Sequence, residues 1–251
     1  MAETSRGRVR VEDSPKRVRV YLGGEVVADT RHAKLVWEIP YYPHYYFPRA
    51  DVRTDLLVAT DTVTHSPSRG DAHHFTVKAG TSEATDAAWQ YVDSPIEELR
   101  DLVRFDWEPM DAWFEEDEEV FTHARSPYTR VDILDSSRHV QVVVNGVTVA
   151  DSHHPKLLFE TGLPTRYYLP RVDVRMDLLT PTETVTHCPY KGEAHTWAVR
   201  AGADVIPDLA WSYRAPLRES LPIAGLFAFY NEKVDLIVDG EALERPHTHF
   251  S

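Results

Sequence analysis

The chain of 251 residues contains one long internal repeat. When Val140 is placed beneath Val18, a shift of 122 residues, the two stretches align without a gap as far as Tyr91. About half of the aligned residues are identical, as in "VTHSPSRGDAH" and "VTHCPYKGEAH". A solenoid repeats every ~20–50 residues, so a repeat of this length predicts two domain-sized copies.

The aligned segments set the expected domain organisation. We place the first copy at residues 15–110 and the second at 137–245, with tails at 1–14 and 246–251. The segment 111–136 between them begins with an acidic run, which is typical of a solvated linker. Its second half mixes apolar, aromatic and basic residues and is expected to pack on one copy. The two copies are expected either to pack against each other or to act separately, and the oligomeric state is left open.

Composition and charge exclude several classes of protein. The net charge is −13 and the basic residues are scattered, which argues against a nucleic-acid partner. No apolar stretch approaches the ~20 residues of a membrane span, and the N-terminus lacks the apolar run of a signal peptide. The single cysteine, Cys188, cannot form an internal disulfide. We therefore expect a cytoplasmic protein that binds neither nucleic acid nor membrane.

Turn signals and alternating patterns predict antiparallel β-structure in each copy. Asn145-Gly146, and Gly23-Gly24 in the first copy, favour tight hairpin turns. The stretch "TVTHCPYKGEAHTWAV" reads as strand, turn and strand, with Pro189 and Gly192 in the turn. The alternation of "RVDVRMDLL" predicts a further strand over 171–179.

One segment of the first copy carries a helix signal. In "SPIEELRDLVRF", Ser94 can cap a helix and Glu97 can complete a capping box. Pro222 interrupts the matching segment of the second copy, so any helix there is shorter. The expected fold is mainly β, with two tandem copies of a small antiparallel β-barrel or β-tent-like domain and short helical segments.

Cys188 and His195 are the catalytic candidates, because a nucleophilic thiol needs a nearby base. Lys191 or a protonated His187 could favour the thiolate. Ser66 replaces the cysteine in the first copy, and no acidic third member is evident. Zinc could use the same ligand types, but adjacent strand residues point to opposite faces. We therefore expect no metal site here.

A ligand pocket in the second copy is the other reading of these motifs. Aromatic side chains often line such pockets, and the candidates for its walls are Tyr168, Trp211 and Tyr213. Candidates for polar contacts to an anionic group are Arg171, His187, Lys191 and His195. The alternating Arg and Asp residues of 171–177 can equally form an ion-paired sheet face. No glycine-rich phosphate loop is visible, and we expect no cofactor.

Several motifs resemble the domain of unknown function family 427, which some collections file as nucleotidyltransferase-like. They are "YYLPRVDVRMDLL", "THCPYKGEAHTW", "AWSY" and "IAGLFAFY". The resemblance covers nearly the whole chain as a tandem pair and implies a small, mostly β domain. The transferase label fits the residues poorly, because an arginine separates Asp173 from Asp177 where magnesium would want closely spaced carboxylates.

The second copy matches the pattern of this family more closely than the first. The first copy has Ser66, Ser68, Arg69 and Arg104 where the second has Cys188, Tyr190, Lys191 and Gly225. The leading hypothesis is thus a tandem β module that binds a small polar or anionic molecule in the second copy. The alternatives are a hydrolytic or transferase enzyme and a protein-interaction module that uses the acidic linker.

Overall fold

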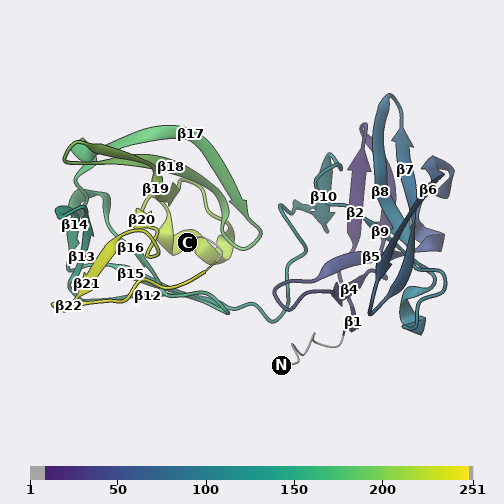
Figure 1. The fold of residues 1–251 in the computed structure, drawn as a ribbon, viewed down its shortest axis with the longest axis horizontal. Helices are drawn as coiled ribbons and strands as arrows, with labels where there is room; N and C mark the ends of the chain where they lie inside the picture. Colours follow the sequence, from purple (N-terminus) through teal and green to yellow (C-terminus); the bar gives the residue numbers. More distant parts are fainter. Residues whose placement is uncertain (1–8, 249–250) are drawn as a thin grey trace. The chain divides into compact units, whose positions relative to one another are not determined.

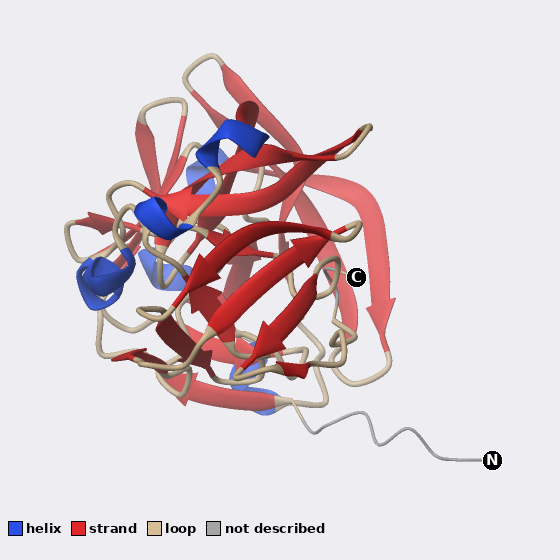
Figure 2. Cartoon of the chain, turned by 90° about the vertical axis from the view of Figure 1, so that its left-hand side faces the viewer, coloured by secondary structure: helices blue, strands red, loops and turns tan. Residues whose placement is uncertain are grey.

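The structure is a computed structural model that describes residues 9–248 and 251. The chain divides into two compact units, Met1–Ser126 and Pro127–Ser251. Strands dominate both units, and helix is confined to short turns (Figures 1 and 2). Within the described residues, no helix is both long and apolar enough to cross a bilayer.

The first unit is built from two antiparallel sheets. The larger has the order β1-β4-β5-β9-β8-β7-β6, and the smaller has the order β11-β10-β2-β3. The strands are β1 (Arg10–Asp13), β2 (Val18–Leu22), β3 (Glu25–Thr30), β4 (Lys34–Trp37), β5 (His44–Pro48), β6 (Leu57–Ser66), β7 (Gly70–Ala79), β8 (Ser82–Gln90), β9 (Leu102–Phe105), β10 (Ala112–Glu115) and β11 (Glu118–Glu119).

The second unit repeats this arrangement with its larger sheet in two parts. The parts have the orders β12-β15-β16 and β17-β18-β19-β20, and a bridge between Leu169 and Phe227 joins them. The smaller sheet is β14-β13-β21-β22. The strands are β12 (Val131–Asp135), β13 (Val140–Val144), β14 (Val147–Ser152), β15 (Lys156–Glu160), β16 (Arg166–Tyr168), β17 (Leu179–Cys188), β18 (Gly192–Ala201), β19 (Asp204–Tyr213), β20 (Ala228–Phe229), β21 (Asp235–Val238) and β22 (Glu241–Ala242). Two tandem, mainly β copies are therefore confirmed, and no sheet of the described chain closes into a barrel.

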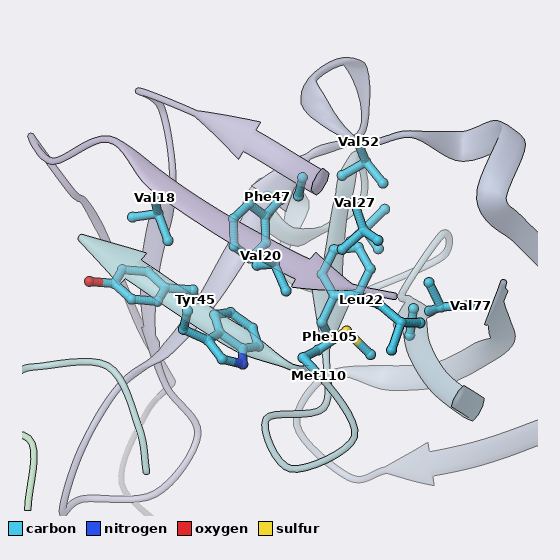
Figure 3. Packing of buried hydrophobic residues seen from close by; sticks show 14 of the residues in the cluster. Val18, Val20, Leu22, Val27, Tyr45, Phe47, Val52, Val77, Phe105 and Met110 are labelled. Atoms are coloured by element: carbon cyan, nitrogen blue, oxygen red, sulfur yellow. The ribbon is translucent and has the colours of Figure 1, made fainter. Parts of the chain in front are cut away.

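Each unit has a large apolar core and a smaller second one. In the first unit, Val18, Val20 and Leu22 alternate with half-buried residues along β2, so one face of this strand enters the large core. Figure 3 shows them beside Phe47 and Phe105. The same alternation recurs along β13, so the internal repeat of the sequence is also a repeat in how the core is packed.

The hairpins predicted from the turn residues are confirmed. Asn145 and Gly146 connect β13 to β14 with φ of 47° and 78°, and Gly23 and Gly24 connect β2 to β3 with φ of 59° and 76°. The left-handed region favours these residue types. The stretch around Cys188 forms the hairpin of β17 and β18, as expected.

The strand predicted over residues 171–179 is wrong. Two 3-10 turns, Arg171–Asp173 and Met176–Leu178, occupy this segment ahead of β17. Arg175 makes a bidentate pair with Asp177 two residues along, at 2.9 and 2.7 Å. Arg175 and Asp177 therefore pair locally rather than across a strand pair, Asp173 accepts a hydrogen bond from Ser152 in β14, and Val172 is left 90% exposed.

The helix predicted from "SPIEELRDLVRF" is also largely wrong. Ser94 Oγ accepts the Ile96 N–H at 3.1 Å, but only Glu97–Leu99 forms a 3-10 turn. The residues that follow form β9, which pairs with both β5 and β8. Ladder hydrogen bonds on both sides, together with burial of Leu102, Val103 and Phe105, outweigh the local helix signal.

The start of the expected acidic linker lies inside the first unit. β10 pairs with β2, opposite Val18 to Tyr21. Glu115 is only 3% exposed and its carboxylate accepts hydrogen bonds from Tyr45 Oη at 2.6 Å and Arg125 Nε at 3.0 Å. Local charge density suggested a solvated run, whereas partners distant in sequence bury this residue.

Both copies begin earlier than the aligned segments indicated. β1 and β12 precede residues 15 and 137 and pair with β4 and β15. The same ion pair, Lys34 with Asp13 and Lys156 with Asp135, joins these strands in each unit. The edge strands are thus part of the repeated domain.

Candidate functional site

The β17–β18 hairpin separates the predicted site residues onto two faces. Cys188 is opposite Gly192, His187 is opposite Glu193, and His195 is opposite Val185. Because side chains alternate along a strand, Cys188 shares the face of Ala194, while His187 and His195 project from the other face. The expected pairing of Cys188 with His195 as its base therefore does not form.

The two histidines share a different partner. Glu193 lies between them, with carboxylate contacts of 3.4 Å to His187 Nε2 and 3.1 Å to His195 Nε2. All three side chains are partly exposed. They form a cross-strand group on the outside of the hairpin, apart from the predicted aromatic residues.

The three predicted aromatic residues do come together, as a closed cluster. Trp211 Nε1 donates to Tyr168 Oη at 3.1 Å, and their rings meet edge to face at 6.2 Å. Tyr213 belongs to the same small core, and all three side chains are nearly fully buried. Instead of lining an open cavity, these rings fill the space beneath the hairpin.

A buried ion pair lies beside this aromatic cluster. Lys191 Nζ donates to Glu160, and their side chains are 10% and 8% exposed. Burial acts to lower the pKa of Lys191, but the neighbouring Cys188 and Glu160 raise it above its ordinary value. Lys191 is therefore a charged group held inside the domain, with the half-exposed Cys188 next to it.

The tyrosine hydroxyls of this region stay protonated at every physiological pH. Burial raises the pKa of Tyr168 far above its ordinary value. Burial also raises the pKa of Tyr213, with further contributions from Tyr168, Cys188 and Glu160. Both hydroxyls can therefore act as hydrogen-bond donors but not as general bases.

A second buried ion pair supports the cluster from β16. Arg166 binds Glu232 through two hydrogen bonds of 2.7 and 2.8 Å, and its guanidinium lies over the Trp211 ring. Burial acts to raise the pKa of Glu232, but hydrogen bonds from Arg166 and Thr248 lower it to about 2. Thr248, assigned to a tail by the sequence, thus contacts this unit through its hydroxyl at 2.6 Å.

Arg171 does not join the site. It is exposed at the start of a 3-10 turn, and the described residues show no hydrogen bond or ion pair between its guanidinium and the buried cluster. Of the seven predicted ligand-binding residues, the structure groups four, namely Tyr168, Lys191, Trp211 and Tyr213. We call these four with Cys188 and Glu160 the hairpin cluster.

The first unit carries a counterpart of the hairpin cluster. Glu38, at the position of Glu160, accepts hydrogen bonds from Tyr46 and Arg104 and pairs with Arg69 at 3.3 Å. Arg69 stands where Lys191 stands, and Ser66 replaces Cys188. Sequence reasoning missed both glutamates, although the alignment of the two copies places one beneath the other.

Comparison with known families agrees with this duplicated architecture. A family model described as "Domain of unknown function (DUF427)" matches residues 10–116 and again 132–240. The chain belongs to the DUF427 family. The first DUF427 match contains the edge strand β1 and also β10. The second DUF427 match contains most of the edge strand β12. No curated protein matches the chain.

Proposed function

We propose that the second DUF427 domain binds a small polar molecule at the hairpin cluster. The observation that supports this is the Lys191–Glu160 ion pair, which is buried in a small apolar core beside a half-exposed thiol. Ionisable groups with perturbed pKa values gather at functional sites more often than elsewhere.

A contribution to folding stability does not by itself explain the Lys191–Glu160 ion pair. Removing two charges from water costs several kcal/mol per ion, and apolar replacements of buried pairs are often as stable or more so. Both DUF427 domains nevertheless keep a glutamate and a cation at these positions. A binding role explains why such an arrangement is present.

The charges in the cluster define the chemistry of the ligand. Glu160 already neutralises Lys191, so a simple anion gains little from the site. A ligand with both donor and acceptor groups can instead use the Glu160 carboxylate, the Lys191 ammonium and the tyrosine hydroxyls together. We therefore favour a polar ligand, such as an amino acid or a hydroxy acid, over a purely anionic one.

The exposed fractions of the side chains indicate where a ligand would enter the hairpin cluster. Trp211 and Tyr213 are nearly fully buried, whereas Cys188 and Tyr190 are half-buried at the hairpin. A ligand would approach on the Cys188 side and displace local contacts around the hairpin turn. Binding at this position would shield the thiol from solvent.

The only cysteine of the chain makes this proposal directly testable. The rate at which a thiol reagent labels Cys188 is measured against a panel of amino acids, hydroxy acids and sugars. We expect some of these compounds to slow labelling and to raise the melting temperature. The double variant Glu160→Gln with Lys191→Met, which leaves no unpaired buried charge, should lose this protection.

The control is Arg69→Met in the first DUF427 domain, where Glu38 keeps its ion pair with Arg104, and it should retain protection of Cys188. If no compound slows labelling, or if the second-domain variant is protected as well as the native protein, ligand binding at the hairpin cluster is refuted.

The second candidate function is an enzyme that uses Cys188 as a nucleophile. The observation in its favour is the Lys191 ammonium beside the thiol, because a neighbouring cation favours the thiolate. Iodoacetamide at neutral pH should then label Cys188 faster in the folded protein than in urea. Labelling only after unfolding would identify Cys188 as a core residue. A working thiol would also fit the reducing cytoplasm.

Two further readings have less support. Nucleotidyl transfer would need carboxylates free to hold magnesium, yet Asp173 accepts the Ser152 hydroxyl at 2.6 Å and Asp177 is paired with Arg175. An interaction surface on the acidic segment loses part of its basis, because Glu115 is buried inside the first domain.

A further inference from the structure

Three side chains on the outer face of β13 and β14 could hold a metal ion. The nearest ligand atoms of His139, Asp151 and His153 all lie within 4.8 Å of one another. These residues are far from the hairpin in sequence, and none of them belongs to the hairpin cluster. We propose that they form a surface binding site for a divalent transition metal ion, with Zn²⁺ as the favoured occupant.

The register of β13 and β14 explains why His139, Asp151 and His153 lie close together. Gln141 is opposite Asp151 and Val140 is opposite Ser152, so His139 and His153 stand opposite each other at the end of the same ladder. Alternation puts all of them on the solvent face, while Val140, Val142 and Ala150 enter the core. Two histidines and one carboxylate are thus brought together by backbone pairing alone.

The ligand atoms of these side chains lie close enough together to reach a common ion. His139 Nε2 lies 2.7 Å from Asp151 Oδ1, and the rings of His139 and His153 stack with centroids 4.1 Å apart. Ligand atoms around a tetrahedral zinc, at bond lengths of about 2.0–2.2 Å, lie about 3.3 Å apart. Because the two rings are nearly parallel, they must turn so that their nitrogen lone pairs point toward a shared ion.

Supporting residues already hold the ligands in place. Gln141 Nε2 donates to Asp151 Oδ2 at 2.8 Å, which orients the carboxylate, and Asp239 accepts the backbone N–H of His139 at 2.9 Å. Such outer contacts tune metal sites. Two imidazoles with one carboxylate suit zinc and leave a coordination position for water.

The first DUF427 domain provides an internal contrast at these positions. Arg17, Asp29 and Arg31 stand where the second domain has His139, Asp151 and His153. Arg17 forms a bidentate salt bridge with Asp29, at 2.7 and 2.5 Å. An arginine stays protonated and cannot ligate a metal. Of the two domains, only the second has two histidines and an aspartate at these positions, although the strands pair in the same way in both.

The test is isothermal titration of the metal-stripped full-length protein with ZnCl₂ in a buffer that does not chelate zinc. We expect one Zn²⁺ per chain. The double variant His139→Arg with His153→Arg copies the first domain at these two positions, so it should fold, as circular dichroism can verify, yet lose zinc binding. Gln141→Ala should weaken binding by about tenfold, because it removes only the orienting contact.

The control is His187→Ala with His195→Ala, which removes another partly exposed pair of histidines and should leave the titration unchanged. Absence of a zinc isotherm for the native protein overturns the proposal. So does an isotherm that survives the two arginine substitutions or disappears in the control.

Discussion

At the residue scale, the same position carries different chemistry in the two domains. His44 in β5 corresponds to Arg166 in β16. Arg166 pairs with Glu232, whereas the neutral His44 ring accepts a hydrogen bond from Arg104 at 3.0 Å through Nδ1. Arg104 in turn pairs with Glu38. The two domains thus satisfy their buried charges through different networks on equivalent strands.

His44 makes the first domain sensitive to acid. Burial and the adjacent Arg104 lower its pKa from 6.5 to about 4. Between these values the unfolded chain takes up a proton that the folded domain does not, so stability is lost as the pH falls from 6.5 toward 4. The loss is roughly 3 kcal/mol, at 1.36 kcal/mol per unit of pKa. Urea unfolding of the first domain across this range measures it.

The variant His44→Gln keeps a hydrogen-bond acceptor but does not titrate, and it should flatten this part of the pH profile. His187→Gln, at an exposed position, should leave it unchanged. An unaltered slope in His44→Gln would show that other groups cause the acid sensitivity.

At the element scale, the hairpin turns decide which residues the backbone accepts. Gly23 and Asn145 occupy the same turn position with φ of 59° and 47°. A Cβ on Gly23 would lie 2.3 Å from Ala79 O, whereas Asn145 has room and donates to Asp204 at 3.1 Å. Equivalent turns therefore differ in sequence because of what packs beside them.

We expect Gly23→Ala and Gly24→Ala to differ in stability despite being neighbours. Both residues have positive φ, which costs a side chain about 1 kcal/mol. A Cβ on Gly24 meets no atom within 4 Å, so Gly24→Ala should lose only that amount. Gly23→Ala must also shift backbone and should lose about 3 kcal/mol. Denaturant unfolding of the first domain compares them, and equal losses would contradict the predicted clash.

At the scale of the whole molecule, each unit holds its own cores. The large and small clusters of the first unit use residues up to Ala124, and those of the second begin at Val131. Each unit has what a domain needs to unfold as its own cooperative element.

A buried variant in one unit should therefore leave the other unaffected. Glu232→Gln leaves Arg166 without its charged partner and should destabilise the second unit by about 3 kcal/mol. Hydrogen exchange, read peptide by peptide in the full chain, should show faster opening only beyond residue 126. Faster exchange in the core strands of the first unit as well would show that the two units unfold together.

The local sequence predicted the structure correctly where the local signal and the tertiary contacts favour the same conformation. The Asn145-Gly146 turn and the hairpin around Cys188 are predictable because a tight turn is a local requirement that Asn, Gly and Pro meet. The grouping of Tyr168, Trp211 and Tyr213 also followed from matched motifs. The duplication came from residue identity alone, and the turn signals predicted that each copy is mainly β.

Tertiary structure decided what depends on distant partners. The helix signal at Ser94 gave way to β9 because pairing with β5 and β8 offered more hydrogen bonds and burial. The carboxylates of Glu38, Glu115 and Glu160 are buried beside cations distant in the sequence, namely Arg69, Lys16 and Lys191. Cross-strand register set Cys188 apart from His195 and brought His139 to His153. The repeat determined that there are two domains, and the register of their strands determined which side chains meet.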